Sequence, residues 1–137
     1  MNRKNLQEIS RIRTRESRIL LDAGYYNGAY YVVGYSVECA LKACVAKQVK
    51  RYDFPDKKFV DKVFTHDLEK LMELAGLMPE FQKDIKAKPT LRLNWTIVKD
   101  WSEEVRYKIG YTEPQARDLY FACTGRNGIL PWIRKRW

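Results

Sequence analysis

The sequence predicts an all-α protein, and two observations carry that prediction. Apolar residues recur at intervals of three and four along several segments, which is the period of an amphipathic helix. No segment shows the alternation of apolar and polar residues that a half-buried strand requires. With 137 residues, 45% of them hydrophobic, the chain suits one domain with one core. We expect a single domain over residues 1–137, folded as an antiparallel bundle of four to five main helices with short helical turns near the C-terminus.

The two longest predicted helices form the centre of this bundle. Residues 6–23 carry an apolar stripe and a separate arginine stripe, and Gly24 follows where helices commonly end in a left-handed residue. A short connection leads to a second helix over residues 28–50, whose interior contains no proline. We expect the two helices to run antiparallel. The second is apolar on nearly every side, so it should be the core element.

The next segment contains a break and a short helix. Pro55 interrupts the pattern, so residues 51–64 are expected to form a loop or a pair of short turns. Thr65 is predicted to cap a third helix, whose apolar face ends where Gly76 stops it.

Three further helical segments are predicted in the C-terminal half. Residues 79–87 begin with a proline, which suits the first turn of a helix. Residues 91–101 are assigned to a helix, although their apolar pattern fits more than one type of element. Thr112 opens a capping-box pattern that predicts a helix over residues 113–124. A last helical turn or two is expected from Pro131.

The charge of the chain indicates the kind of partner. Lysine and arginine outnumber acidic residues, and the formal net charge is +9. A basic surface attracts phosphate-bearing or acidic molecules and speeds their encounter. The excess favours nucleic acid, nucleotide or an acidic protein as a group, without selecting one of them.

The cysteines and the N-terminus indicate a reducing compartment. Cys39 and Cys44 lie on one predicted helix and point about 140° apart, and Cys123 makes their number odd, so no disulfide is expected. The polar N-terminus has no secretory signal pattern, and no run of about 18 apolar residues occurs. We expect a soluble cytoplasmic protein without a membrane span.

One face of the second helix is the main site candidate. At about 100° per residue, Tyr31, Tyr35, Glu38 and Lys42 fall within a sector of about 60°. In a structural role, Glu38 and Lys42 form an exposed ion pair, or a buried pair satisfied by the tyrosine hydroxyls. In a functional role, the face lines a groove or a subunit interface, where Lys42 contacts phosphate and Glu38 orients a hydroxyl. Gly34 near this face would admit a ligand or a backbone, and close helix packing explains it equally well.

His66 and Arg106 are secondary candidates. His66 is the only histidine, and no cysteine pair has ligand spacing with it, so a zinc site is not expected. It is expected at the start of the third helix as a neighbour of the cap or a partner of a carboxylate, with ligand binding as the alternative. Arg106 lies in residues 100–116, predicted to be mostly loop, where it either stacks on a base or a partner or pairs with a glutamate.

The sequence lacks the motifs of common enzymes. It contains no glycine-rich nucleotide fingerprint, no Walker-type lysine and no Gly-x-Ser-x-Gly pattern. An ordinary kinase, dehydrogenase or hydrolase is therefore disfavoured, and no cofactor or metal is expected.

The order of several motifs resembles one known family. The block "GAYYVVGYSVECALKA" is followed by "HDLEKL", then by "WSEEVRY" and a closing "GILPWIRK". Over most of the chain this order resembles the HEPN domain family of prokaryotic helical proteins. The resemblance implies a helical bundle that is commonly a homodimer. It also implies a frequent partner, a minimal nucleotidyltransferase encoded beside it as part of a toxin–antitoxin pair.

Many HEPN proteins are metal-independent RNases, and this sequence departs from their motif. That motif is an arginine and a histidine with four to six residues between them, late in the chain. Arg126 and Asn127 resemble its opening, but the histidine positions hold Pro131, Trp132 and Ile133. RNase activity by the usual mechanism is therefore disfavoured.

The leading hypothesis is a HEPN-like bundle that dimerises and binds nucleotide or RNA beside a nucleotidyltransferase partner. Two alternatives stay open: an RNase toxin with a rearranged site that uses Arg126 and Asn127, and a purely structural dimerisation or adaptor module. The candidate site residues of the leading hypothesis are Glu38, Lys42, Tyr31, Tyr35, His66 and Arg106.

Overall fold

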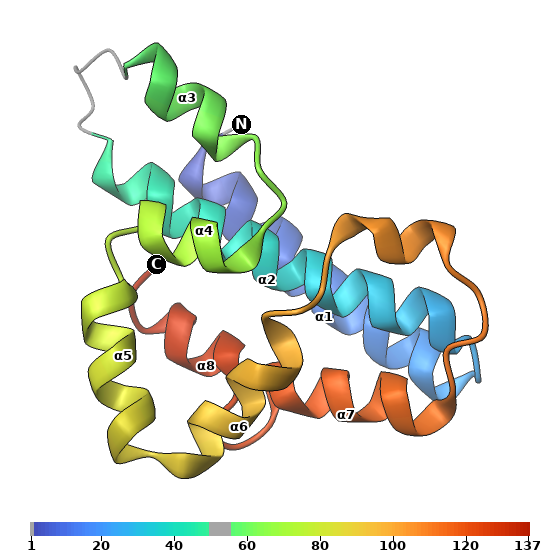
Figure 1. The fold of residues 1–137 in the computed structure, drawn as a ribbon. Helices are drawn as coiled ribbons and strands as arrows, with labels where there is room; N and C mark the ends of the chain where they lie inside the picture. The colour runs from blue at the N-terminus through green and yellow to red at the C-terminus, as the bar shows by residue number, and fades with distance from the viewer. Residues whose placement is uncertain (1, 50–55) are drawn as a thin grey trace.

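The computed structural model describes residues 2–49 and 56–137, and all regular structure in them is helical (Figure 1). No strand forms in these residues, which confirms the all-α prediction. Five of the described helices have ten residues or more, in agreement with the expected four to five main helices. In chain order the elements are α1 (Arg3–Asp22), α2 (Tyr26–Gln48), α3 (Lys57–Val63), α4 (Leu68–Leu74), α5 (Met78–Ala87), α6 (Pro89–Val98), the 3₁₀ helix η1 (Glu103–Tyr107), α7 (Glu113–Thr124) and α8 (Ile129–Arg134).

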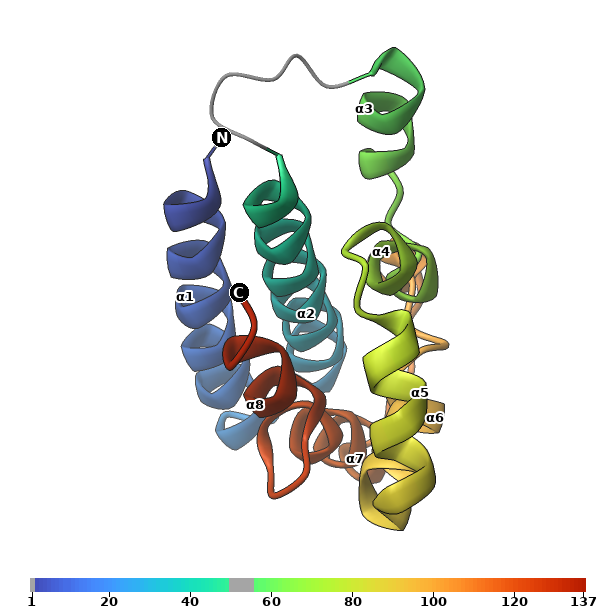
Figure 2. The same cartoon turned by 90° about the vertical axis from the view of Figure 1, so that its left-hand side faces the viewer.

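Helices α1 and α2 form an antiparallel hairpin, as the sequence predicts (Figure 2). Helix α1 begins at Arg3, earlier than expected, because the side chain of Asn2 caps it by accepting a hydrogen bond from the Asn5 backbone N–H at 2.9 Å. Gly24 ends the helix in the left-handed region, with φ of 84°. Helix α2 begins at Tyr26, two residues before its predicted start, and its predicted last residue lies outside the described residues.

Buried serines join the two helices of the hairpin. The Ser10 hydroxyl donates to the Ser36 carbonyl, and the Ser36 hydroxyl donates to the Ser10 carbonyl, both at 2.9 Å. The Ser17 hydroxyl donates to the Ala29 carbonyl at 2.8 Å. These bonds satisfy hydroxyl groups that water cannot reach. The polar groups buried between α1 and α2 therefore carry little free-energy penalty.

The other helices pack around α2 and around each other. Helices α4, α7 and α8 contact α2 directly, while α5 and α6 form a second hairpin against α8 (Figures 1 and 2). Phe81 of α5 meets Trp95 of α6 and Trp132 of α8 edge to face, with ring centroids 5.0 and 4.8 Å apart. This aromatic cluster ties the second hairpin to the core.

The prediction of a loop or short turns before the third helix was wrong for residues 57–63, which form helix α3. Asp56 caps it, accepting from the Lys58 backbone N–H at 3.3 Å. The part of that prediction that covers residues 51–55 lies outside the described residues. Thr65 as an N-cap was also wrong. Asp67 caps α4 by accepting from the Lys70 backbone N–H, and the Thr65 hydroxyl accepts from the Asp67 backbone N–H.

The remaining helix predictions hold with shifts at their ends. Helix α6 ends at Val98, so Trp101 lies beyond it, and the predicted loop that follows contains η1. Helix α7 has its predicted bounds, with both capping-box bonds of Thr112 formed. Helix α5 begins one residue before Pro79, and α8 begins two residues before Pro131 because Gly128 is its cap. Among the described residues, no helix combines the length and apolarity needed to cross a membrane.

Candidate functional site

A charged network links α2, the α3–α4 connection and η1. Glu38 lies in the middle of α2 and is only 1% exposed. Its carboxylate is hydrogen-bonded to Nδ1 of His66, and Nε2 of the same ring lies 2.9 Å from Oε2 of Glu103. Arg106 extends the network, with Nη2 3.8 Å from the same Glu103 oxygen. An imidazole donates from both nitrogens only when it is protonated, so the arrangement suits a cationic His66 between two carboxylates.

Local structure explains why His66 reaches this position. The residue directly precedes the N-cap of α4, where the Thr65 hydroxyl and the Asp67 carboxylate each accept a backbone hydrogen bond at 3.1 Å. These bonds fix the chain just before the helix. Glu103 is the first residue of η1, which packs on α2 beside Glu38.

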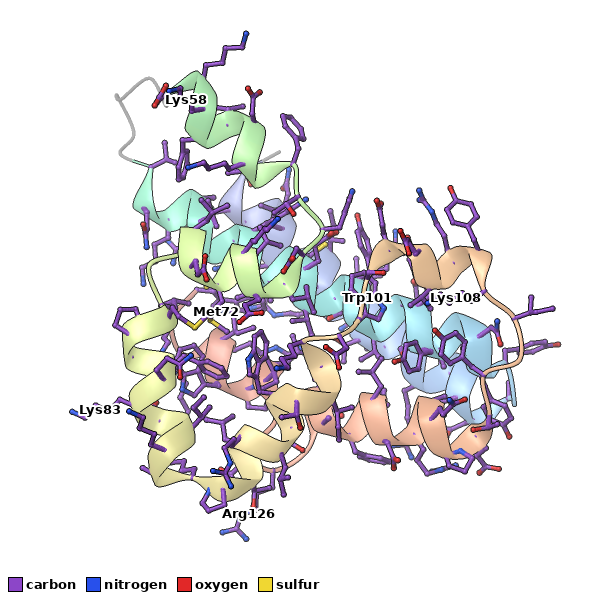
Figure 3. All side chains as sticks on the ribbon, viewed as in Figure 1. Lys58, Met72, Lys83, Trp101, Lys108 and Arg126 are labelled. Carbon is purple, nitrogen blue, oxygen red and sulfur yellow. The ribbon has the colours of Figure 1, made fainter. Side chains whose placement is uncertain are left out.

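Aromatic rings pack beside the network on the same face of α2. The ring of Tyr31 stacks on Tyr35 and on Trp101, with centroids 6.3 and 6.0 Å apart. Trp101 is buried directly over Gly34, where a Cβ would come within 3.0 Å of the indole. Figure 3 labels Trp101 beside α2. Gly34 therefore makes room for Trp101. Close packing, and not the approach of a ligand, explains this glycine.

A groove of about 400 Å³ lies beside the network, between α2 and α3. The part that α2 contributes changes along the helix from polar to apolar. In chain order, the polar Tyr35, Glu38 and Lys42 precede the apolar Val45, and Val49 follows just after the end of α2. Its apolar wall is completed by Leu6, Phe59, Val60, Val63 and Phe64. A groove with a mainly apolar lining and a few polar groups at one end is typical of small-molecule sites.

Burial keeps two polar groups of the groove uncharged. Burial raises the pKa of Tyr35 to about 12, and the neighbouring Cys39 adds to the same effect. Burial also raises the pKa of Cys39 to about 11. At neutral pH, Tyr35 therefore offers a neutral hydroxyl, and Cys39 is a thiol and not a nucleophilic thiolate. Positive charge in the described lining comes from Lys42.

The structure brings the predicted residues of α2 together with the secondary candidates. Tyr35, Glu38 and Lys42 line the groove, while Tyr31 lies outside it against Trp101. In the described residues, Glu38 bonds to His66 and forms no ion pair with Lys42, so the predicted i, i+4 pair is not present there.

Of the alternatives left open for His66 and Arg106, the structure shows the contact with carboxylates for both. His66 contacts two of them, and Arg106 lies near Glu103. The phenol of Tyr107 raises the pKa of Arg106, and Tyr31 acts in the same direction.

The residues of the incomplete RNase motif lie elsewhere. Arg126 and Asn127 are exposed in the turn between α7 and α8, with Asn127 in the left-handed region at φ of 55°. Figure 3 labels Arg126 at the opposite end of the molecule from Lys58 of α3. Within one protomer, Arg126 and Asn127 do not join the network of His66.

Sequence reasoning missed several residues of this site. Glu103 was not singled out, although its place two residues after the buried Trp101 positions it beside α2. The groove residues of α3 were missed because residues 57–64 were expected to be a loop. Within residues 2–49 and 56–137, no group of three His, Cys, Asp or Glu side chains is placed to hold a metal ion.

Comparisons of the chain with family models, curated proteins and solved structures found no match. The structure itself defines an all-α protein in which a charged network around one buried carboxylate adjoins an apolar groove.

Proposed function

We propose that this chain is a HEPN-like protein that binds a nucleotide in the groove between α2 and α3. The observation that carries the proposal is the position of Lys42, which lines a mainly apolar groove near the Tyr35 hydroxyl. A nucleotide combines a flat base with anionic phosphate. Its site therefore needs an apolar surface and a cation in the same cavity.

The state of Glu38 supports this assignment. An unpaired carboxylate one turn from Lys42 would repel an incoming phosphate. Glu38 is instead hydrogen-bonded to His66, and no ion pair joins it to Lys42 among the described residues. The ammonium group of Lys42 thus remains the attractive charge for a phosphate at this end of the groove.

The other end of the groove suits a base or another flat apolar group. Phe59 and Val63 of α3 line the groove together with Val45 of α2 and Val49 at the end of that helix. Burial of apolar surface between them contributes about 25 cal/mol per Å², so an aromatic ring placed there adds substantially to affinity.

The arrangement of side chains favours ligand binding over RNA cleavage as the function. A cleavage site built on Arg126 and Asn127 needs a histidine beside them, and within one protomer His66 is bonded to Glu38 and Glu103. The RNase alternative therefore needs residues from a second protomer. RNA incubated with the protein and EDTA tests it, because metal-independent cleavage that Arg126→Ala abolishes would favour the RNase.

The resemblance to HEPN proteins extends the proposal to partners. The chain would form a homodimer and act in the cytoplasm with a minimal nucleotidyltransferase, in a toxin–antitoxin type system. RNA is the alternative ligand of the same surface, since the net charge of +9 favours either anion. Sedimentation equilibrium of the purified chain tests the dimer, and a monomer at micromolar concentration would count against it.

Isothermal titration of the nucleic-acid-free protein with ATP and with a short RNA, at low and moderate salt, tests the site. Lys42→Ala is the test variant, and Lys83→Ala, exposed on α5 and labelled in Figure 3, is the matched control. We expect saturable ATP binding that weakens about tenfold or more in Lys42→Ala, because a charge-assisted contact is lost. Equal affinity of wild type and a folded Lys42→Ala would remove Lys42 from the site.

A further inference from the structure

Helix α3, which forms one wall of the groove, has few buried contacts with the rest of the protein. None of the residues of α3 is buried, whereas α4, a few residues further on, buries Leu68, Leu71 and Met72. The apolar side chains Phe59 and Val63 of α3 line the groove and are only partly buried where they pack against the core. Figure 2 shows α3 standing apart from the α1–α2 hairpin and continuing into α4. Few buried contacts therefore keep α3 in place.

His66 is the point where the chain after α3 is fastened. Both nitrogens of its ring are bonded, one to Glu38 of α2 and one to Glu103 of η1. The charged groups around the ring are these two carboxylates, Arg106 of η1 beyond Glu103, and Lys42 one turn along α2 from Glu38. The connection between α3 and α4 is thus clamped from two sides.

From this arrangement we infer that α3 is a lid on the groove and that the two bonds of His66 form its latch. With the latch closed, the α3–α4 connection is held against α2, and Phe59 and Val63 stay at the groove. With the latch broken, little else holds α3, and the groove opens to solvent. Control of ligand entry by the latch rests on the proposed function, whereas the lid itself does not.

Glu38 connects the latch to the ligand site because it is part of both the latch and the groove. It lines the groove and also bonds His66. A phosphate placed on Lys42 adds negative charge near Glu38, which strengthens the attraction of that region for the cationic His66. Ligand binding therefore tightens the latch. By linkage, a closed latch raises the affinity for the ligand by the same factor.

Hydrogen–deuterium exchange of the ligand-free chain tests the lid. The wild type is compared with His66→Ala and Glu103→Gln, and with Glu104→Gln as a control at an exposed position of η1. We expect exchange in residues 57–64 to become about tenfold faster in His66→Ala, less so in Glu103→Gln, and to stay unchanged in the control. Residues 68–74 should keep their protection. Unchanged exchange in residues 57–64 would overturn the lid, and so would an equal increase in residues 68–74.

ATP addition separates the lid from the proposed ligand. Bound ATP should slow exchange in residues 57–64 of the wild type, and ATP should dissociate several times faster from His66→Ala than from the wild type. If ATP does not bind at all, the proposed function is wrong, and so is the control of ligand entry by the latch. The exchange data on the ligand-free chain still show whether α3 acts as a lid. If ATP binds and leaves exchange in residues 57–64 unchanged, the coupling between ligand and latch is wrong.

Discussion

Trp101 occupies the space over Gly34 that any side chain at that position of α2 would need. A Cβ built on Gly34 falls within 3.0 Å of the indole, and Trp101 is 2% exposed. The indole also stacks on Tyr31, so it has little freedom to move. The contact joins the segment before η1 to the core helix and so positions Glu103 beside His66.

Replacement of Gly34 by alanine should destabilise the fold. Alanine favours a helix interior over glycine by about 1 kcal/mol, but the added methyl collides with a rigid buried ring. We expect a net loss of about 1–3 kcal/mol in the free energy of unfolding, measured by urea denaturation.

Gly28→Ala provides the matched control on the same helix. A Cβ at Gly28 would lie 3.2 Å from a terminal methyl of Leu20, and that flexible side chain can shift. Its stability should stay within about 1 kcal/mol of the wild type, with helix propensity acting in its favour. Equal stability of Gly34→Ala and the wild type would contradict the packing role of Gly34.

The two bonds of His66 should contribute unequally to stability. His66→Ala leaves the buried Glu38 carboxylate without its hydrogen-bond partner, which should cost about 1–3 kcal/mol. Glu103→Ala removes a side chain that is 37% exposed, so water replaces it and the loss should stay below about 1 kcal/mol.

Glu38→Gln in the His66→Ala background tests the cause of that difference. The neutral amide removes the buried charge, so the double variant should recover part of the stability that His66→Ala loses. The contrary result is that His66→Ala and Glu103→Ala lower the free energy of unfolding equally in urea denaturation, with no recovery in the double variant. That result would show that the buried Glu38 does not need His66 as a partner.

The three cysteines should be unreactive in the native state. Burial raises the pKa of Cys39 and of Cys44 to about 11, and burial also raises the pKa of Cys123. At pH 8 the first two thiols are then about 0.1% thiolate, and reactivity should increase as the pH rises towards 11. We expect a thiol reagent at pH 8 to modify all three rapidly in urea and none rapidly without it. Fast modification of the native protein would contradict this burial.

Local signals made part of the fold predictable from the sequence. Helix α7 has its predicted bounds because the capping box of Thr112 depends only on residues three apart. Helix α3 was missed because Pro55 and a mixed charge pattern hide a short helix that Asp56 caps. Such a helix has no buried stripe, so hydrophobic periodicity does not detect it.

The candidate site was predictable only where it lies on one helix. Tyr35, Glu38 and Lys42 were grouped by helical geometry, and the structure places them on one groove. The partner of Glu38 could not be derived, because His66 is 28 residues away in the sequence and meets it through tertiary packing. Helical spacing favoured the nearer Lys42, but burial of Glu38 under the α3–α4 connection brought His66 to it instead.

The serine seam between α1 and α2 should contribute to the stability of the hairpin. The Ser36 hydroxyl donates to the Ser10 carbonyl at 2.9 Å and lies 2.6 Å from the hydroxyl of Thr14. Ser36→Ala removes these contacts in a fully buried place and should lower the free energy of unfolding by about 1–2 kcal/mol, even though alanine is the better helix former. Thr96→Ala, which removes an exposed hydroxyl bonded within its own helix, should change stability by less than about 0.5 kcal/mol. If urea denaturation finds both variants equally stable, apolar packing alone holds α1 to α2.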